Sequence, residues 1–213
     1  MTSSDKSDVQ DYARANEKSR KRKTAREKML AYKTNEKGLL IVHTGKGKGK
    51  STAAFGLVLR AIGNGMRVGV VQFVKGKWQT GERRVLEGFP DQVDIYAMGE
   101  GFTWDTQDRA RDIKAAQTAW ATVCEMIDAA RHSPPRYDML VLDELNIVLR
   151  YGTLPLDDVV ETLKNRHPDL HIVVTGRNAK TTLIEAADLV TEMTLVKHPF
   201  REQNVRAQKG IEF

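Results

Sequence analysis

The sequence predicts an α/β domain with a mostly parallel sheet of about six strands flanked by helices, preceded by a basic N-terminal helical extension. Three observations favour this class. Short apolar runs alternate with longer runs at helical spacing, as expected of strands joined by crossover helices. A loop rich in glycine and lysine separates the first apolar run from the first helical run, and the chain before residue 37 is polar and basic. We assign residues 1–36 to the extension and residues 37–213 to the domain.

The apolar runs are interpreted as strands. Val68-Gly69-Val70-Val71 is apolar without alternation, which is typical of a strand buried on both faces. We expect these strands to be parallel and joined by right-handed crossovers. Ligands of such sheets bind at the carboxyl ends of the strands. The predicted strands cover residues 38–43, 67–74, 93–98, 137–142, 170–175 and 189–196.

Helices are predicted between these strands, at residues 51–63, 105–132, 156–165 and 181–187. The longest contains neither glycine nor proline, and its apolar side chains recur at helical spacing. We expect this stripe to face the core, so that Trp120 and Cys124 are structural residues rather than ligand contacts.

The positive charge is concentrated near the N-terminus. The whole chain carries +6, whereas residues 1–33 hold ten Lys and Arg against five Asp and Glu, which leaves +1 for the other 180 residues. A nearly neutral domain argues against nucleic acid as its ligand. A single cysteine excludes an intramolecular disulfide, and no apolar run approaches the roughly 20 residues that span a bilayer. We therefore expect a cytoplasmic protein without membrane contact.

The extension contains the basic cluster Arg20-Lys21-Arg22-Lys23 within a stretch compatible with a helix. Most basic runs of this kind are solvated or disordered. The alternative is a helix that covers an anionic ligand.

A phosphate-binding loop follows the first strand. Its glycines let backbone N–H groups converge on phosphate oxygens, Lys50 supplies a charge, and Ser51 can place its hydroxyl on Mg²⁺ at a helix N-terminus. These features predict a P-loop NTPase-like (RecA-like) domain. The loop consists of Thr44, Gly45, Lys46, Gly47, Lys48, Gly49, Lys50, Ser51 and Thr52.

This loop is one residue shorter than the usual pattern, because only three residues separate Gly45 from Gly49 and Thr44 occupies the expected glycine position. A tighter loop need not hold a triphosphate as a γ-phosphoryl-transferring enzyme does. A reaction in which the phosphates leave together is therefore open.

Two further segments carry charged side chains to the same edge of the predicted sheet. Asp143 and Glu144 end the fourth strand, where a carboxylate can hold Mg²⁺ beside the triphosphate or simply cap the next helix. Arg177 follows the fifth strand and could bind an anion or an acidic neighbour.

The run Gly99-Glu100-Gly101-Phe102-Thr103-Trp104 places two large aromatic side chains between glycines and a helix start. Leaving such rings in water costs about 1.5–3 kcal/mol each, so either the core or a ligand must cover them. Composition alone favours the core.

Over residues 38–213 the sequence resembles the P-loop type of ATP:corrinoid adenosyltransferase. The resemblance rests on the phosphate-binding loop, the run 99–104 with Gln107-Asp108, and three further motifs: Leu142-Asp143-Glu144-Leu145-Asn146, Thr175-Gly176-Arg177, and Val196-Lys197-His198 with Gln208-Lys209-Gly210-Ile211. Members of this family transfer the 5′-deoxyadenosyl group of ATP to Co(I) of a reduced corrinoid and release triphosphate.

The resemblance implies a role for each motif. Lys50 and Glu144 are the expected catalytic residues, and Thr44 to Thr52 with Arg177 would bind ATP. Ser51, Asp143 and Glu144 would hold Mg²⁺ or Mn²⁺, and Phe102 and Trp104 would cover the lower face of the corrinoid. A homodimer and an electron-donor protein, such as a flavodoxin or a flavin reductase, are the implied partners.

Two alternatives are weighed against this hypothesis. A P-loop phosphotransferase or kinase would need a base for its acceptor hydroxyl, and Asp143 could serve. A RecA-like nucleic-acid-binding ATPase would use the basic extension, and its binding would depend steeply on salt.

Overall fold

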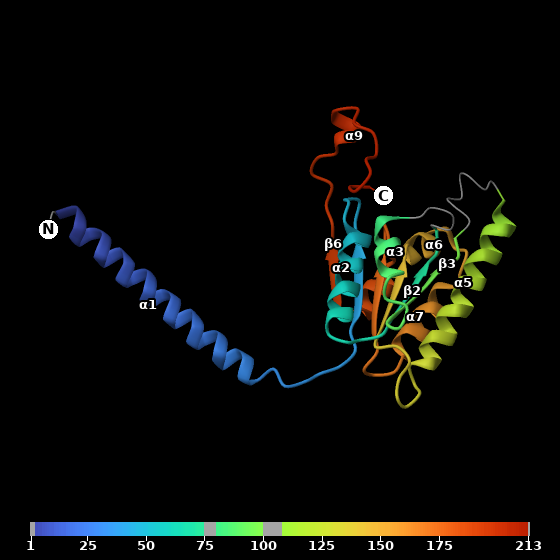
Figure 1. The fold of residues 1–213 in the computed structure, drawn as a ribbon, viewed down its shortest axis with the longest axis horizontal. Coiled ribbons are helices and arrows are strands. Elements are labelled where there is room, and N and C mark those ends of the chain that lie inside the picture. Colours follow the sequence, from blue (N-terminus) through green and yellow to red (C-terminus); the bar gives the residue numbers. More distant parts are fainter. Residues whose placement is uncertain (1–2, 75–79, 100–107, 213) are drawn as a thin grey trace. The chain divides into compact units, whose positions relative to one another are not determined.

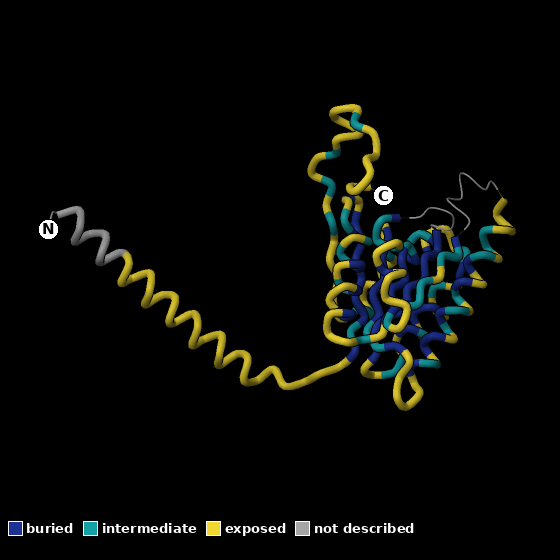
Figure 2. Tube along the Cα trace, in the orientation of Figure 1, coloured by how far each residue is buried: buried dark blue, intermediate teal, exposed yellow. Residues whose placement is uncertain are grey.

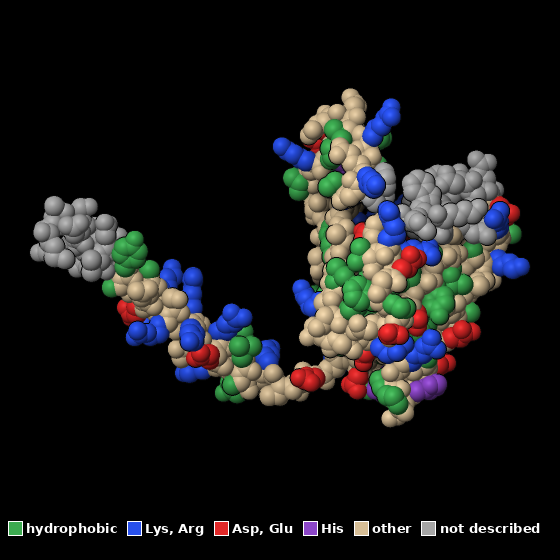
Figure 3. Space-filling model, viewed as in Figure 1, with side chains coloured by type: hydrophobic (Ala, Val, Ile, Leu, Met, Phe, Trp, Pro, Cys, Tyr) green, Lys and Arg blue, Asp and Glu red, His purple; other side chains and the backbone are tan. Residues whose placement is uncertain are grey.

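A computed structural model describes residues 3–74, 80–99 and 108–212. The chain divides into two compact units, Met1–Glu36 and Lys37–Phe213. The first unit consists mainly of helix α1 (Ser3–Ala31). Its described side chains, from residue 12 onward, are exposed, and blue Lys and Arg side chains stand along the helix in Figure 3. Lys21–Glu17 and Lys23–Glu27 form ion pairs one helical turn apart.

The second unit is built on a six-stranded sheet in which every strand pair is parallel, with the order β3-β2-β4-β5-β1-β6. This confirms the predicted α/β class. In chain order the strands are β1 (Leu40–Thr44), β2 (Val68–Gln72), β3 (Val93–Ala97), β4 (Met139–Asp143), β5 (His171–Thr175) and β6 (Leu189–Glu192).

Helices cover both faces of this sheet (Figure 1). Helices α2 (Lys50–Gly63) and α3 (Gly81–Leu86) pack on one face, and their buried side chains share a cluster with alternate residues of the strands. The other face is covered by α5 (Arg109–Ala129), α6 (Leu145–Tyr151), α7 (Leu156–Lys164) and α8 (Thr181–Ala186). The short helix α9 (Pro199–Glu202) follows β6.

The strands are buried on both faces, as their unbroken apolar runs predict. Met139 and Val141 of β4 face the α2 side, and Leu140 and Leu142 face the α5 side. Figure 2 shows this buried centre in dark blue, within a shell of half-buried and exposed helices. The edge strand β6 is exposed along its whole length, whereas β3 at the other edge is mostly half-buried.

Most predicted elements are present, with ends shifted by a few residues. The expected strand at 189–196 ends at Glu192, and the helix expected at 105–132 spans Arg109–Ala129, with Asp108 as its N-cap. The predicted start of this helix lies outside the described residues. Ala116, Val123 and Ile127 are buried, Trp120 packs against the core, and Cys124 is only half-buried. No helix in the described parts of the chain is long and apolar enough to cross a bilayer.

Candidate active site

The carboxyl ends of β1, β2, β4 and β5 lie at one edge of the sheet. Gln72 is in register with Asp143, and His43 is in register with Thr175, so the last residues of neighbouring strands meet there. The phosphate-binding loop continues directly from β1, and Lys50 begins helix α2. The predicted loop and the predicted acidic pair are therefore brought to the same edge.

Backbone geometry explains the glycines of the loop. Gly45 and Gly49 have φ angles of 97° and 100°, which favour glycine. A Cβ atom at Gly47 would lie 2.7 Å from the carbonyl oxygen of Met193. The N–H of Gly47 donates to that carbonyl at 2.7 Å, and the N–H of Met193 donates to the carbonyl of Thr44 at 2.9 Å. The segment after β6 thus supports the loop, and one predicted phosphate-binding N–H is bonded to it.

Each of two loop lysines has a partner within the protein. The ammonium of Lys50 donates to the carbonyl of Gly47, and that of Lys48 pairs with the carboxylate of Glu212 near the C-terminus. Lys50 is buried, whereas Lys46 and Lys48 are exposed. A triphosphate that used these lysines would replace protein acceptors with stronger anionic ones.

Asp143 organises the opposite side of the site. Its side chain is fully buried, and Oδ1 accepts hydrogen bonds from the hydroxyls of Ser51 and Thr175, both at 2.7 Å. Oδ2 accepts from the amide of Gln72 at 3.2 Å. This network joins the phosphate-binding loop to β2, β4 and β5, so its geometry is set before any ligand binds.

Glu144 holds an unusual backbone conformation between β4 and α6. Its φ and ψ angles are 67° and 18°, a left-handed conformation that costs a non-glycine residue free energy. Its N–H donates to the hydroxyl of Thr175 at 2.9 Å, and its carboxylate does not cap α6. Helix capping therefore does not explain the acidic pair, because Asp143 is bonded to side chains of the site instead.

Arg177 lies in a turn that packs against the acidic segment. The amide of Asn146 donates to the carbonyl of Gly176 at 3.0 Å, and the N–H of Ala179 donates to the hydroxyl of Thr44 at 3.0 Å. Thr44 is thus bonded to this turn. Sequence reasoning used Asn146 and Thr175 only as parts of motifs, and it missed Gln72 and Glu212, because their contacts arise only when distant segments meet.

The electrostatic environment of Lys50 shows which charges lie near it. Burial lowers the pKa of Lys50, the positive charges of Arg177 and Lys48 lower it further, and the carboxylate of Glu144 opposes the shift. Burial also lowers the pKa of His43, whose Nδ1 lies 3.3 Å from the carbonyl oxygen of Lys50. A cluster of cations beside one carboxylate is suited to a polyanionic ligand.

The donor set fits a hard divalent cation that is completed by a substrate. Hydroxyl and carboxylate oxygens, from Ser51, Asp143 and Glu144, suit Mg²⁺ or Mn²⁺ rather than a softer metal. No group of three or more His, Cys, Asp or Glu in the described ranges could hold a metal alone. Phe102 and Trp104 lie outside the described residues.

Comparison with known proteins agrees with this geometry. The profile of the family described as ATP:corrinoid adenosyltransferase BtuR/CobO/CobP matches residues 36–213. A corrinoid adenosyltransferase of Sinorhizobium sp is 55% identical over 205 residues, covering 95% of this chain and 93% of its own. The corresponding protein of Pseudomonas aeruginosa is 48% identical, covering 94% and 96% of the two chains, and that of Escherichia coli K12 is 44% identical, covering 86% and 90%.

The first of these alignments is longer than the range 36–213, so it extends into the basic N-terminal segment. The family profile spans the whole second unit, including the phosphate-binding loop, the acidic pair and the turn at Arg177. The chain belongs to the BtuR/CobO/CobP family of ATP:corrinoid adenosyltransferases.

Proposed function

We propose that the protein transfers the 5′-deoxyadenosyl group of ATP to the cobalt of a reduced corrinoid, in adenosylcobalamin biosynthesis or salvage. Co(I) donates an electron pair to the 5′-carbon, and a cobalt–carbon bond forms. The bond between that carbon and the 5′-oxygen breaks, and its electron pair leaves with triphosphate. No proton has to be removed, so the site needs no general base.

One observation carries the proposal beyond family membership: the hydroxyl of Ser51 donates to Asp143, which is also bonded to Thr175. The phosphate-binding loop and the ends of β4 and β5 therefore form one rigid site. Such a site can hold a whole triphosphate as a leaving group, because its cations face the anion from one edge of the sheet.

The loop cations would stabilise the charge that develops on triphosphate. We assign this role to Lys50, Lys46 and Lys48, with Arg177 from the neighbouring turn. Two lysines already have acceptors, so binding exchanges the carbonyl of Gly47 and the carboxylate of Glu212 for phosphate oxygens. The exchange avoids leaving a buried ammonium without a partner.

A divalent cation, Mg²⁺ or Mn²⁺, is part of the proposal. When bound, it would add positive charge to the leaving triphosphate. We expect Ser51 and Glu144 to contribute ligands, because Asp143 already accepts three hydrogen bonds and is fully buried. Asp143 is then best suited to orient Ser51, directly or with a water between it and the metal.

The corrinoid half of the proposal rests on the resemblance of the sequence. Phe102 and Trp104 would cover the lower face of the corrinoid and displace its axial ligand, which would ease reduction of Co(II). A reducing protein such as a flavodoxin or a flavin reductase would supply the electron. We also propose a homodimer and a cytoplasmic location, where ATP and reductants are available.

The phosphotransferase alternative has less support. Asp143 was the candidate base for an acceptor hydroxyl, and its full burial and three hydrogen bonds hold it away from any acceptor. A general base must come within hydrogen-bonding distance of the proton that it removes. This carboxylate instead holds the site together.

An anaerobic assay tests the proposal. The protein is mixed with Mg²⁺, ATP and chemically reduced cobalamin, and the corrinoid spectrum and the phosphorus-containing products are followed together. We expect the adenosylated spectrum and one triphosphate for each corrinoid converted. Formation of diphosphate or inorganic phosphate as the primary product, without an adenosylated corrinoid, would contradict the proposal.

A further inference from the structure

Asn146 links an acidic segment of the site to a basic one, and no step of the proposed reaction uses it. It lies in the first turn of α6 and its side chain is fully buried. Its Nδ2 donates to the carbonyl of Gly176, 30 residues further along the chain. The contact therefore connects the segment that carries Glu144 to the turn that carries Arg177.

The turn at Gly176 is packed directly against this side chain. Gly176 has a φ angle of 126°, and a Cβ atom there would lie 2.8 Å from Cβ of Asn146 and 3.3 Å from Oε2 of Glu144. Glycine is thus required for both the backbone angle and the close approach. The position of the turn is set by Asn146 on one side.

The other end of the turn is held by the phosphate-binding loop. The N–H of Ala179 donates to the hydroxyl of Thr44, and Asn178 adopts a left-handed φ angle of 56°. Arg177 is exposed and stands between these two anchors. Without the hydrogen bond at Gly176, the turn that carries Arg177 would keep its hydrogen bond to Thr44 but lose its anchor to α6.

Stability does not explain an asparagine at this position. Its Oδ1 is buried and accepts no hydrogen bond from any residue that the structure describes. Such an acceptor is destabilising, and a leucine has nearly the same branched shape without a polar atom to bury. What leucine lacks is the donor to Gly176, so the amide donor is the property that distinguishes asparagine here.

We propose that Asn146 is a positioning residue, which fixes the turn 176–179 so that Arg177 faces the triphosphate. This inference rests on the proposed function, because it requires triphosphate at the phosphate-binding loop. Asn146 would act through Arg177 and would not itself contact the phosphates.

The test variant removes the amide donor of Asn146 and keeps the branched shape of its side chain. Asn146→Leu is compared with the wild type in three measurements: the melting temperature, the Kd for inorganic triphosphate with Mg²⁺ by calorimetry, and the kcat and KM for ATP. We expect a melting temperature within about 4 °C of the wild type. We expect triphosphate affinity to fall by roughly 10-fold to 100-fold, the usual effect of losing a supporting hydrogen bond at such a site.

A control variant removes a hydrogen bond elsewhere. Tyr137→Phe deletes the hydroxyl that donates to Asp94 at 2.6 Å, at the start of β4 and thus at the other end of the strands. We expect its triphosphate affinity to equal that of the wild type. Asn146→Ala, which cannot overpack the site, is a second test variant and should show the same loss of affinity as Asn146→Leu.

A double-mutant cycle with Arg177→Ala separates positioning from a general structural effect. If Asn146 acts through Arg177, Asn146→Leu should weaken triphosphate binding no further when Arg177 is already absent. An equal fold-loss in both backgrounds, or wild-type affinity in Asn146→Leu, would overturn the role of Asn146. A wild-type protein that binds no triphosphate would instead overturn the proposed function.

Discussion

The two ends of the parallel strands use polar side chains in different ways. At the amino edge, Arg166 is largely buried and donates to the carbonyls of Leu170, Leu163 and Gly38 at 3.0, 2.9 and 2.8 Å. Asp188 accepts from the N–H of Leu40 at 2.9 Å and also pairs with Lys37 and Arg166. Every one of these contacts fixes a strand or a connection.

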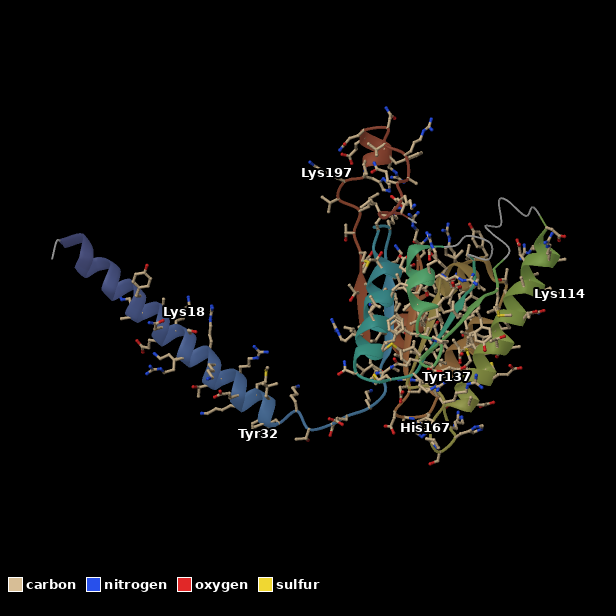
Figure 4. The ribbon with its side chains drawn as sticks, in the orientation of Figure 1. Lys18, Tyr32, Lys114, Tyr137, His167 and Lys197 are labelled. Atoms are coloured by element: carbon tan, nitrogen blue, oxygen red, sulfur yellow. The ribbon has the colours of Figure 1, made fainter. Side chains whose placement is uncertain are left out.

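At the carboxyl edge, the arrangement of several residues lowers the stability of the fold. Glu144 has a left-handed backbone, and within the described chain Oδ1 of Asn146 is buried without a donor. Lys50 is buried near Arg177 and Lys48, and the resulting pKa shift shows that folding disfavours its charge. Figure 4 shows the two ends, with Tyr137 and His167 at the amino edge and Lys197 beyond the carboxyl edge.

The comparison shows where stability and function are separated in this fold. Contacts at the amino edge hold the strands in register, whereas those at the carboxyl edge hold the charged side chains of the proposed triphosphate site. Backbone strain and buried unsatisfied groups are concentrated at functional sites in proteins generally. Substitutions at the carboxyl edge should therefore lower activity without lowering stability, and substitutions at the amino edge should lower stability without lowering activity.

The largest effect is expected for Lys50→Met, which keeps the aliphatic stem and removes the charge. The kcat/KM for ATP should fall by roughly 10² to 10³, because the proposed site loses one of the cations that would stabilise the leaving group. The melting temperature should stay the same or rise, since burial and neighbouring cations disfavour the charged lysine. Steady-state kinetics and a thermal melt on the same sample measure both, and a marked drop in melting temperature would contradict this account.

Arg166→Ala should lower the stability of the protein and leave its activity unchanged. Three backbone carbonyls would lose their donor, so the free energy of unfolding should fall by about 2–4 kcal/mol and the melting temperature by roughly 5–15 °C. The kcat/KM of the folded variant, measured well below its melting temperature, should match the wild type. A loss of activity without a loss of stability would show that the two edges are not separate.

Asp188→Asn should destabilise the protein by about 1 kcal/mol at neutral pH. Hydrogen bonds from Lys37 and from the N–H of Leu40 hold the pKa of Asp188 below its ordinary value. The carboxylate therefore stabilises the fold above the unfolded-state pKa, and that contribution disappears as the pH falls through the folded-state pKa. Chemical denaturation of both proteins between pH 7 and pH 3 should show the difference shrinking, and a difference that grows in acid would contradict the sign.

The smallest effect is expected for Glu212→Gln. In the proposed site its carboxylate competes with triphosphate for Lys48, so the variant should bind inorganic triphosphate roughly twofold to fivefold more tightly at low salt. The gain should shrink at high salt, because exposed charges are screened. Glu125→Gln on α5 makes the same charge change on an exposed residue and should have no effect. Weaker binding by Glu212→Gln would show that this carboxylate supports the site.

Much of the fold follows from the sequence because it is encoded locally. The apolar runs of β1, β2, β4 and β5 and the glycine-rich loop are periodic or contiguous signals, and they predicted both the sheet and the edge where Ser51 and Asp143 meet. Helices α3 and α6 were not assigned, because six or seven residues carry little periodicity.

The details of the site could not be read from the sequence, because they depend on contacts between distant segments. Gly47 is bonded to Met193, Lys48 to Glu212, and Asn146 to Gly176, and no local pattern connects these residues. Gly45 and Gly47 were assigned to phosphate binding alone. Their close approach to Met193 shows that packing also requires them.

Calorimetric titration of inorganic triphosphate, with Mg²⁺, tests the separation of the two edges most directly. We predict that the wild type and Arg166→Ala bind one triphosphate with equal affinity, despite their different melting temperatures. Lys50→Met should bind at least 10-fold more weakly at an unchanged or higher melting temperature. Undiminished binding by Lys50→Met, or a loss of binding in folded Arg166→Ala, would contradict the account.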